Sequence, residues 1–487
     1  CQIFDEVLGR KNTGVNENFF ELGGHSISAL LLLSRIRMET KKRIAMKDIF
    51  SHSTVEELSK LLSEDNNNDY NRKMEHASTK SYYEMSSAQK RMYFLWEKDK
   101  ESISYNVPQI YKIVGNIDVE KIRNVYNTLV KRHEILRTRF FMSDSGEPVQ
   151  QICNDVEPEF KYIIDEDSSE DDIISSFIRP YDLSKPSLIR LQIVKRSGEY
   201  LFMIDMHHIV CDATSYEIFT GEFSDLYNNK ELKDVDYQYK DYSEWVKERD
   251  FSEQRKYWLN QFQDNIPVIN LPISGKRDNS QRDRGKTINR HLSGNITEKL
   301  KKIAKEYSVT DNMLFVAATM ILLHFYGNQS DIVLGIPISG RTLQETENIL
   351  GMFVNTLALK SKVDETINFG DYLEQIKNMC IKAYENQEYP FDELIADLKL
   401  GGDMQTNPLF NVMLTFHQSE KDNLRFADSK IEQLDGNNNI VKFDLTFHIA
   451  YMSEGGEIGV EYREDLFDNS TIHRILKQYM MVLNQIA

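Results

Sequence analysis

Residues 200–215 read Y-L-F-M-I-D-M-H-H-I-V-C-D-A-T-S, and this stretch says most about the fold and chemistry of the chain. Its first seven residues are mostly apolar and predict a buried strand. The strand runs into His207 and His208, and Asp212 follows shortly after them. Because successive side chains of a strand point to opposite faces, one histidine should face the core and the other a cavity. Imidazole transfers protons near neutral pH, so the pattern points to an enzyme.

Two other interpretations of the histidine pair remain open from these residues alone. The histidines could bind a metal, but on a strand they diverge and would need partners that we do not identify. They could also be a hydrogen-bonded pair in the core. Cys211 suggests a nucleophile, although a small buried side chain is the more common case. No C-x-x-C pair and no close Cys/His cluster of metal-binding type occurs, so no metal site is expected.

The composition excludes several classes of function. A chain of 487 residues suggests about three units. Its formal net charge of -17 argues against nucleic-acid binding, which selects basic surfaces. No apolar run is long enough to span a bilayer, and no signal peptide opens the sequence, so no membrane association is expected. The four scattered cysteines fit reduced thiols, and we expect a cytoplasmic protein.

Hydrophobic periodicity divides the chain into a helical start, a polar linker and a long α/β remainder. The start is expected to form a small all-α bundle with helices at 26–38, 46–50 and 54–62. In the remainder, helices are expected at 87–97, 119–133, 296–306, 311–326 and 369–388. Strands are expected at 109–114, 188–195, 199–206, 332–338, 411–416 and 457–462.

These patterns give the expected domain boundaries. Residues 1–63 form the first domain, and the polar, aperiodic residues 64–82 form a linker. Domain size favours two α/β lobes, which we place at 83–270 and 271–487.

A second motif, G-G-H-S, ends at Ser26 at the start of a predicted helix. A serine there is usually an N-cap. However, the run F-F-E-L-G-G-H-S-I-S-A-L-L-L-L-S-R-I resembles the carrier-protein family, specifically the peptidyl carriers of nonribosomal peptide synthetases. The resemblance implies that Ser26 carries a 4'-phosphopantetheine arm, and a helix N-terminus suits its phosphodiester. His25 is expected to contact a partner or to position the arm.

The remainder resembles the condensation domains of the same synthetases. Seven motifs occur in family order: S-S-A-Q-K-R-M-Y-F-L, R-H-E-I-L-R-T-R-F, the histidine motif, Y-K-D-Y-S-E-W, L-G-M-F-V-N-T-L-A-L, N-Q-E-Y-P-F-D-E-L and N-P-L-F-N-V-M. The resemblance implies two lobes related to chloramphenicol acetyltransferase, arranged in a V with the active site in a tunnel between them. A four-helix carrier bundle would precede these lobes.

The resemblance also implies roles for the residues of the histidine motif. His208 matches the catalytic histidine of the family, and Asp212 matches a structural position paired with an arginine. A buried carboxylate needs a cation or several N–H donors. We expect Arg137 to be that cation, with Arg132 as the fallback. His207 is expected to hold the loop through buried hydrogen bonds.

Peptide-bond formation is the function that the resemblance implies. Ser26 would present the donor as a thioester, and the amine of an aminoacyl group on a downstream acceptor carrier would attack it. His208 could act as a general base, align the amine or stabilise developing charge. The implied partners are the acceptor carrier, adenylation domains of the same synthetase and a phosphopantetheinyl transferase. We expect the chain to be part of such a larger synthetase.

Two alternatives stay open. Epimerisation domains share the histidine motif and also follow carriers, although no E-G-H-G-R-E-like run occurs, and the motifs look closest to the subtype that joins two L-residues. A recruitment module with impaired catalysis is the other alternative, because Ala213 replaces the glycine usual after Asp212. If that position needs a positive φ, alanine would strain the loop.

Overall fold

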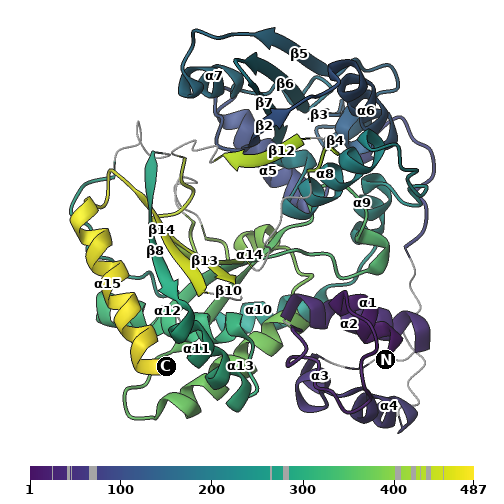
Figure 1. Cartoon of the computed structure of the whole chain (residues 1–487). Coiled ribbons are helices and arrows are strands. Elements are labelled where there is room, and N and C mark those ends of the chain that lie inside the picture. The colour runs from purple at the N-terminus through teal and green to yellow at the C-terminus, as the bar shows by residue number, and fades with distance from the viewer. Residues whose placement is uncertain are drawn as a thin grey trace.

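The computed structural model describes residues 1–24, 26–40, 44, 46–64, 74–263, 266–277, 284–400, 407–417, 424–427, 429–434, 440–452 and 455–487. Figure 1 shows two larger α/β lobes and a small helical domain, which lies below the N-terminal lobe and beside the C-terminal lobe. This architecture confirms the predicted all-α bundle followed by two lobes in a V. His25 and most of the predicted linker, residues 65–73, lie outside the described residues.

The N-terminal domain is the predicted bundle, and it packs around the fully buried Phe19. Phe4, Leu32 and Ile49 complete this core. Gly24 lies against it so closely that a Cβ atom there would be 2.4 Å from the ring of Phe19, which explains one glycine of the G-G-H-S motif. The four helices are α1 (Gln2–Leu8), α2 (Ser26–Thr40), α3 (Met46–Ser51) and α4 (Val55–Glu64).

The N-terminal lobe is built on a five-stranded sheet with the order β12-β2-β7-β6-β5. Helices α6 and α8 pack on one face with the larger core, and α7 covers the other face. The strands are β2 (Asn106–Gly115), β5 (Glu159–Ile164), β6 (Ile189–Arg196), β7 (Glu199–His207) and β12 (Ser429–Leu434). The helices are α5 (Ser87–Lys98), α6 (Val119–Arg132), α7 (Glu170–Phe177), α8 (Ala213–Tyr227), α9 (Tyr239–Lys247) and the short helix η1 (Glu134–Arg137). A separate three-stranded sheet contains β1 (Tyr83–Glu84), β4 (Pro148–Ile152) and β3 (Thr138–Met142).

The C-terminal lobe holds a six-stranded sheet with the order β10-β9-β11-β13-β14-β8. Helices pack on one face, and Figure 1 shows the other face turned toward the N-terminal lobe. The strands are β8 (Gly285–Ser293), β9 (Asp331–Ile338), β10 (Asn355–Lys362), β11 (Val412–His417), β13 (Leu445–Met452) and β14 (Gly455–Arg463). The helices are α10 (Ser252–Gln261), α11 (Gly294–Glu306), α12 (Asp311–Gly327), α13 (Phe369–Glu385), α14 (Phe391–Asp397), α15 (Asn469–Ile486) and the short helix η3 (Gln344–Thr346).

Two segments from the second half of the chain cross into the N-terminal lobe. β12 pairs antiparallel with β2 at the edge of the N-terminal sheet. The segment between β9 and β10 places Ile349, Leu350 and Phe353 in the core of the same lobe. The second half of the chain therefore contributes to both lobes, which a single division near residue 270 does not describe.

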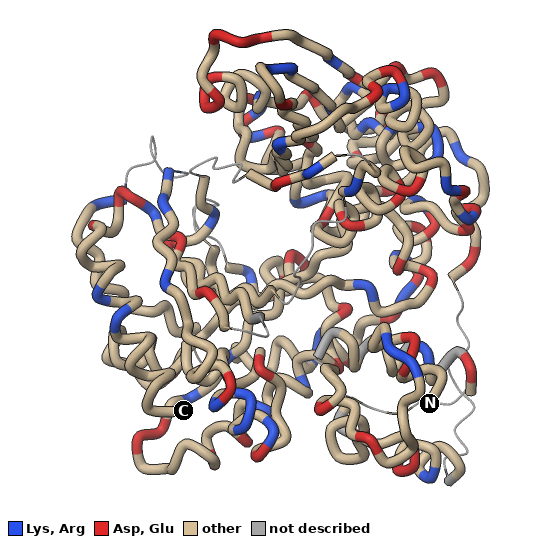
Figure 2. Tube along the Cα trace, viewed as in Figure 1, with Lys and Arg blue, Asp and Glu red and all other residues tan. Residues whose placement is uncertain are grey.

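In Figure 2 the positions of Lys and Arg and those of Asp and Glu are interspersed along the chain in all three parts of the molecule. Among the described residues, no individual helix has the length and apolar character of a membrane span. The consecutive helices α11 and α12 reach that length and composition only together, and they meet at an angle of 104°.

Replacing Ile349 by alanine should destabilise the protein by about 2–5 kcal/mol, because this side chain is buried in a core that joins the two halves of the chain. The matched variant Ile164→Ala removes the same atoms from a side chain that is 66% exposed, and should cost less than about 0.5 kcal/mol. Urea unfolding followed by circular dichroism measures both values. Equal losses would contradict the assignment of the crossing segment to the core.

Candidate active site

His207 ends the central strand β7, His208 begins the short helix that follows, and the two side chains have different surroundings. His207 is buried, and its Nδ1 accepts a hydrogen bond from the backbone N–H of Ile209 at 3.1 Å. Its ring also lies 6.0 Å from the ring of Tyr181, centroid to centroid. These contacts fit a residue that holds the turn, which is the role expected of His207.

His208 is half-buried and opens the short helix η2 (His208–Val210). Its backbone N–H donates to the carbonyl of Tyr105 at 2.8 Å. Its Nδ1 lies 2.9 Å from the carbonyl oxygen of Cys211. Because a carbonyl oxygen only accepts, Nδ1 must carry the proton in this bond. The neutral ring then presents the lone pair of Nε2.

Both histidines are held in the neutral state at physiological pH. Burial, followed by the positive charge of Lys442, lowers the pKa of His208 to about 4. Burial, followed by the charges of His208 and Lys442, lowers the pKa of His207 to about 3. A neutral imidazole with a free Nε2 can accept a hydrogen bond from an amine that approaches it.

Asp212 fixes the turn that follows the histidines. Its carboxylate caps α8 by accepting hydrogen bonds from the backbone N–H and the hydroxyl of Ser215, both at 2.7 Å. It also accepts from Arg341 at 2.9 and 3.2 Å and from the backbone N–H of Phe353 at 3.3 Å. Arg341 and Phe353 both belong to the segment between β9 and β10, so this buried carboxylate joins the two lobes.

The prediction that Arg137 is the partner of Asp212 is wrong. Arg137 ends η1 and donates to the carbonyl of Cys153 at 2.9 Å, because η1 packs against β4 and α9. The fallback, Arg132, pairs with Glu222 at 3.1 Å. The actual partner, Arg341, follows a buried strand in the run I-S-G-R-T. An arginine directly after a strand end was a signal that the sequence analysis did not use.

Ala213 causes no backbone strain. It is the first residue of α8, with helical geometry, and its methyl group is exposed. It is absent from the described non-glycine residues with positive φ. A glycine at this position would therefore not be needed for its conformational freedom.

Cys211 is fully buried, and burial raises the pKa of its thiol well above the ordinary value. Such a thiol is a poor nucleophile, so the small buried side chain is the better interpretation. Within the described part of the chain, no group of three or more His, Cys, Asp or Glu residues has the arrangement of a metal site.

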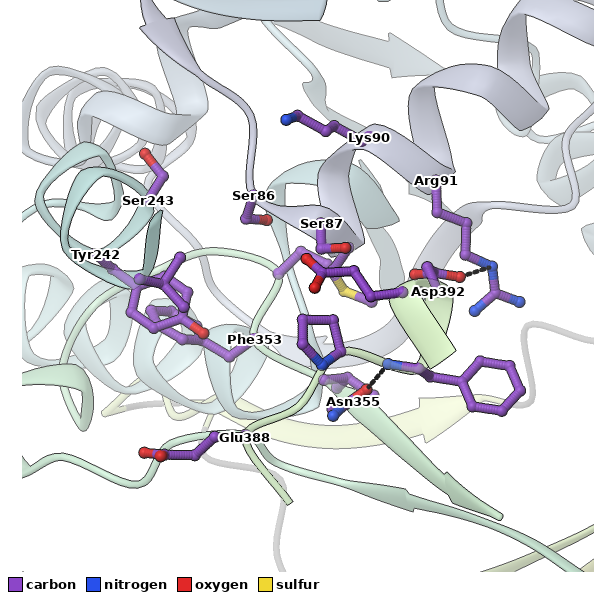
Figure 3. Close-up of a pocket in the computed structure, with 18 of the residues that line it drawn as sticks. Ser86, Ser87, Lys90, Arg91, Tyr242, Ser243, Phe353, Asn355, Glu388 and Asp392 are labelled. Atoms are coloured by element: carbon purple, nitrogen blue, oxygen red, sulfur yellow. Dashed lines mark hydrogen bonds and ion pairs between the residues drawn. The ribbon is translucent and has the colours of Figure 1, made fainter. Parts of the chain in front are cut away.

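A cavity of about 310 Å³ opens between the lobes, and its lining does not include His207, His208 or Asp212. Figure 3 shows the start of α5 on one side and the start of α14 on the other. Arg91 of α5 lies 3.5 Å from Asp392 of α14, so an ion pair crosses the cavity. Phe353 both lines the cavity and binds Asp212 through its backbone, which connects the cavity to the histidine turn.

Ser26 is the first residue of the 15-residue helix α2. The first N–H groups of a helix have no intrahelical acceptor, so the backbone here suits the phosphate of a covalently attached arm.

The N-terminal helical domain contacts the C-terminal lobe. Arg35 of α2 lies 3.1 Å from Glu347, and Glu21 lies 3.0 Å from Lys305 at the end of α11.

Comparisons with known proteins agree with this geometry. Residues 79–487 match the family model of the condensation domain, and residues 1–62 match that of the phosphopantetheine attachment site. The latter match implies a covalently attached 4'-phosphopantetheine. The chain is 38% identical to bacitracin synthase 3 of Bacillus licheniformis, over 100% of this chain and 8% of that protein. It is 37% identical to gramicidin S synthase 2 of Aneurinibacillus migulanus, over 100% of this chain and 11% of that protein. The chain thus spans about a tenth of the length of these relatives.

Solved structures show the same fold at low identity. The X-domain from teicoplanin biosynthesis has a TM-score of 0.77 at 19% identity, covering 85% of this chain and 97% of that one. The four-domain nonribosomal peptide synthetase AB3403, bound to AMP and glycine, has a TM-score of 0.76 at 19% identity. That match covers 85% of this chain and 34% of the synthetase.

Replacing Arg341 by methionine should destabilise the protein by about 3–5 kcal/mol, because the carboxylate of Asp212 would remain buried without its cation. The control Arg137→Met removes an arginine that donates to the Cys153 carbonyl and to Asn154 Oδ1 and lies 3.7 Å from Glu134, and it should cost about 1–2 kcal/mol. Urea unfolding gives both numbers. A larger loss of stability in Arg137→Met than in Arg341→Met would instead favour Arg137 as the partner of Asp212.

The depressed pKa values of the two histidines predict a pH-dependent stability. Between the ordinary histidine pKa of about 6.5 and the folded values, the unfolded chain binds more protons than the folded one. The free energy of unfolding should therefore fall as the pH is lowered from 7 to 5, by up to about 1.4 kcal/mol per pH unit for each histidine. In His208→Gln this fall should be smaller, whereas His291→Gln, at an exposed position, should leave it unchanged. Parallel curves for the wild type and His208→Gln would contradict the neutral state of His208.

Proposed function

The chain belongs to the condensation-domain family of nonribosomal peptide synthetases, a family of amide-forming acyltransferases, and on this premise we propose that His208 promotes peptide-bond formation between a donor carried on Ser26 and an amine from a downstream carrier. The observation that carries the proposal is the geometry of His208. Its Nδ1 donates to the carbonyl of Cys211 at 2.9 Å, which leaves the lone pair of Nε2 as the acceptor of the neutral ring.

Ser26 is the proposed attachment point of the 4'-phosphopantetheine. When attached, this group supplies the donor acyl chain as a thioester on a long flexible tether. The position of the carrier before the condensation domain in the chain supports its role as the donor carrier. The start of α2 contributes backbone N–H groups and the positive end of its dipole to the phosphate.

His208 acts mainly by alignment in this proposal. A group whose pKa is about 4 takes up a full proton reluctantly at neutral pH. It can still accept a hydrogen bond from the N–H of the acceptor amine and direct the nitrogen lone pair toward the thioester carbonyl. Two tethered reactants already meet at a high effective concentration, so orientation is a large part of the rate enhancement.

The ion pair between Asp212 and Arg341 supports this alignment by fixing the turn that carries His208. The ion pair fixes the first turn of α8 to the segment between β9 and β10, and His208 precedes that helix by five residues. His207 holds the same turn through the N–H of Ile209. We assign all three to positioning rather than to chemistry.

The finer features of the reaction are proposed on sequence grounds. The motifs R-H-E-I-L-R-T and G-M-F-V-N-T favour an L-donor and an L-acceptor. The partners would be the downstream acceptor carrier, adenylation domains and a phosphopantetheinyl transferase, and the enzyme would work in the cytoplasm. The fold alone does not decide between catalysis and recruitment, because the teicoplanin X-domain, which shares it, has been solved in a complex with OxyB.

His208→Ala should lower the rate of dipeptide formation about 100-fold, since misplacing a reactant by about 1 Å can cost that much. The assay loads an acyl-pantetheine onto Ser26, adds an L-aminoacyl acceptor carrier and follows the product by mass spectrometry. His291→Ala is the matched histidine control and should keep full activity. Ser26→Ala should accept no acyl-pantetheine.

The same assay separates the alternatives. Loss of the donor α-proton stereochemistry without any acceptor would identify an epimerisation domain. A wild-type rate no higher than that of His208→Ala would identify a recruitment module. Either result would overturn the proposed condensation activity.

A further inference from the structure

The second half of the predicted linker lies against the N-terminal lobe. Met74 is 1% exposed and belongs to the hydrophobic core of that lobe. The ring of His76 stacks on the ring of Tyr237, with 4.5 Å between the centroids and 14° between the planes. Because a core side chain and a stacked ring both hold this segment, we call residues 74–80 the linker anchor.

Asp241 of α9 fixes the backbone of the linker anchor. Its Oδ1 accepts a hydrogen bond from the N–H of Ala77 at 2.7 Å, and its Oδ2 accepts one from the N–H of Gln238 at 2.8 Å. The aspartate is buried, and a buried carboxylate needs such donors. Hydrogen bonds to a charged acceptor are stronger than those between neutral groups. Lys80 adds an ion pair with Glu244 of the same helix. The aspartate of the Y-K-D-Y-S-E-W motif therefore holds the linker.

Helix α9 joins the linker anchor to the cavity between the lobes. Tyr242, Ser243 and Trp245 line the cavity, whereas Asp241 and Glu244 contact the anchor. The N-terminal helical domain lies below α9 in Figure 1. In the described part of the chain, the anchor is the first segment after that domain, and it is already fixed to a helix of the cavity wall.

The linker anchor shortens the covalent path that holds the carrier. Glu64 ends α4, Met74 lies ten residues further along the chain, and Tyr83, which begins β1, lies nineteen residues further along. A chain spans at most about 3.5 Å per residue, so the carrier can reach about 35 Å from Met74, against about 65 Å from Tyr83 without the anchor. The anchor thus limits the region that the carrier can visit.

We propose that the linker anchor is a positioning device that confines the carrier to the side of the molecule where α9 lines the cavity, and so raises the effective concentration of the Ser26 arm there. The confinement does not depend on the reaction, whereas its consequence for donor delivery rests on the proposed function. Effective concentration falls roughly as the −3/2 power of tether length, so releasing the anchor should lower it about 2–3-fold.

Amide hydrogen exchange in the full chain tests the anchor itself. The N–H of Ala77 should exchange at least about tenfold more slowly than in an unfolded peptide, because a buried carboxylate accepts it. Met74→Ser should abolish this protection, and Glu75→Ser, at the exposed neighbouring position, should leave it unchanged. Ala77→Pro removes the donor and serves as the releasing variant if Met74→Ser does not fold. An unprotected Ala77 amide in the wild type would overturn the inference.

A distance measurement tests the confinement without any reaction. Spin labels are placed on Cys1 of the carrier and on Glu120→Cys of α6, both exposed, in a Cys153→Ser background. The distance distribution should extend to longer values in Met74→Ser and stay unchanged in Glu75→Ser. A distribution that is the same in the wild type and in the released variant would contradict the proposed confinement.

Dipeptide formation separates positioning from folding. With the donor on Ser26, the single-turnover rate should fall about 2–3-fold in Met74→Ser. With a soluble acyl-pantetheine thioester as donor, added to chains that carry Ser26→Ala, the rate should not change. Equal losses with both donors would show a merely structural role for Met74 and overturn the inference. Absence of product in the wild type would overturn the proposed function instead, and the exchange and distance measurements would still decide on the anchor.

Discussion

The buried ion pair between Asp212 and Arg341 is the constraint on which the rest of the site depends. It caps α8, it terminates the histidine turn, and it holds the segment that carries Ile349 and Phe353 into the N-terminal core. One carboxylate thus fixes both the histidine turn and the junction of the two lobes. A charge this deeply buried is stable only with its partners in place, so the two functions cannot be separated.

Short-range features of this chain were predictable because the physics that decides them is local. The apolar run before His207 predicted β7 to within one residue, and the G-G-H-S run placed Ser26 at a helix start. Helix α8 was missed although it follows the histidines directly. Its sequence contains Gly221 together with Thr214 and Thr220, which weaken the helical signal. Tertiary packing, rather than propensity, stabilises it.

Long-range features were not predictable from one sequence. Arg341 lies 129 residues from Asp212, and no local pattern connects the two. Arg137 was chosen on the plausible ground that a buried carboxylate needs a cation, and that reasoning was right about the chemistry and wrong about the residue. β12 is similar, because a strand with mostly exposed side chains gives no sign of the lobe that it joins.

The contact between Arg35 and Glu347 bears on how tightly the N-terminal helical domain is held against the C-terminal lobe. Nε of Arg35 and Oε1 of Glu347 are both buried, and neither finds a hydrogen-bond partner among the described residues. Each unpaired atom offsets part of the attraction between the two charges, since water would satisfy it if the domains parted. The two unpaired atoms therefore weaken the contact between the N-terminal helical domain and the C-terminal lobe.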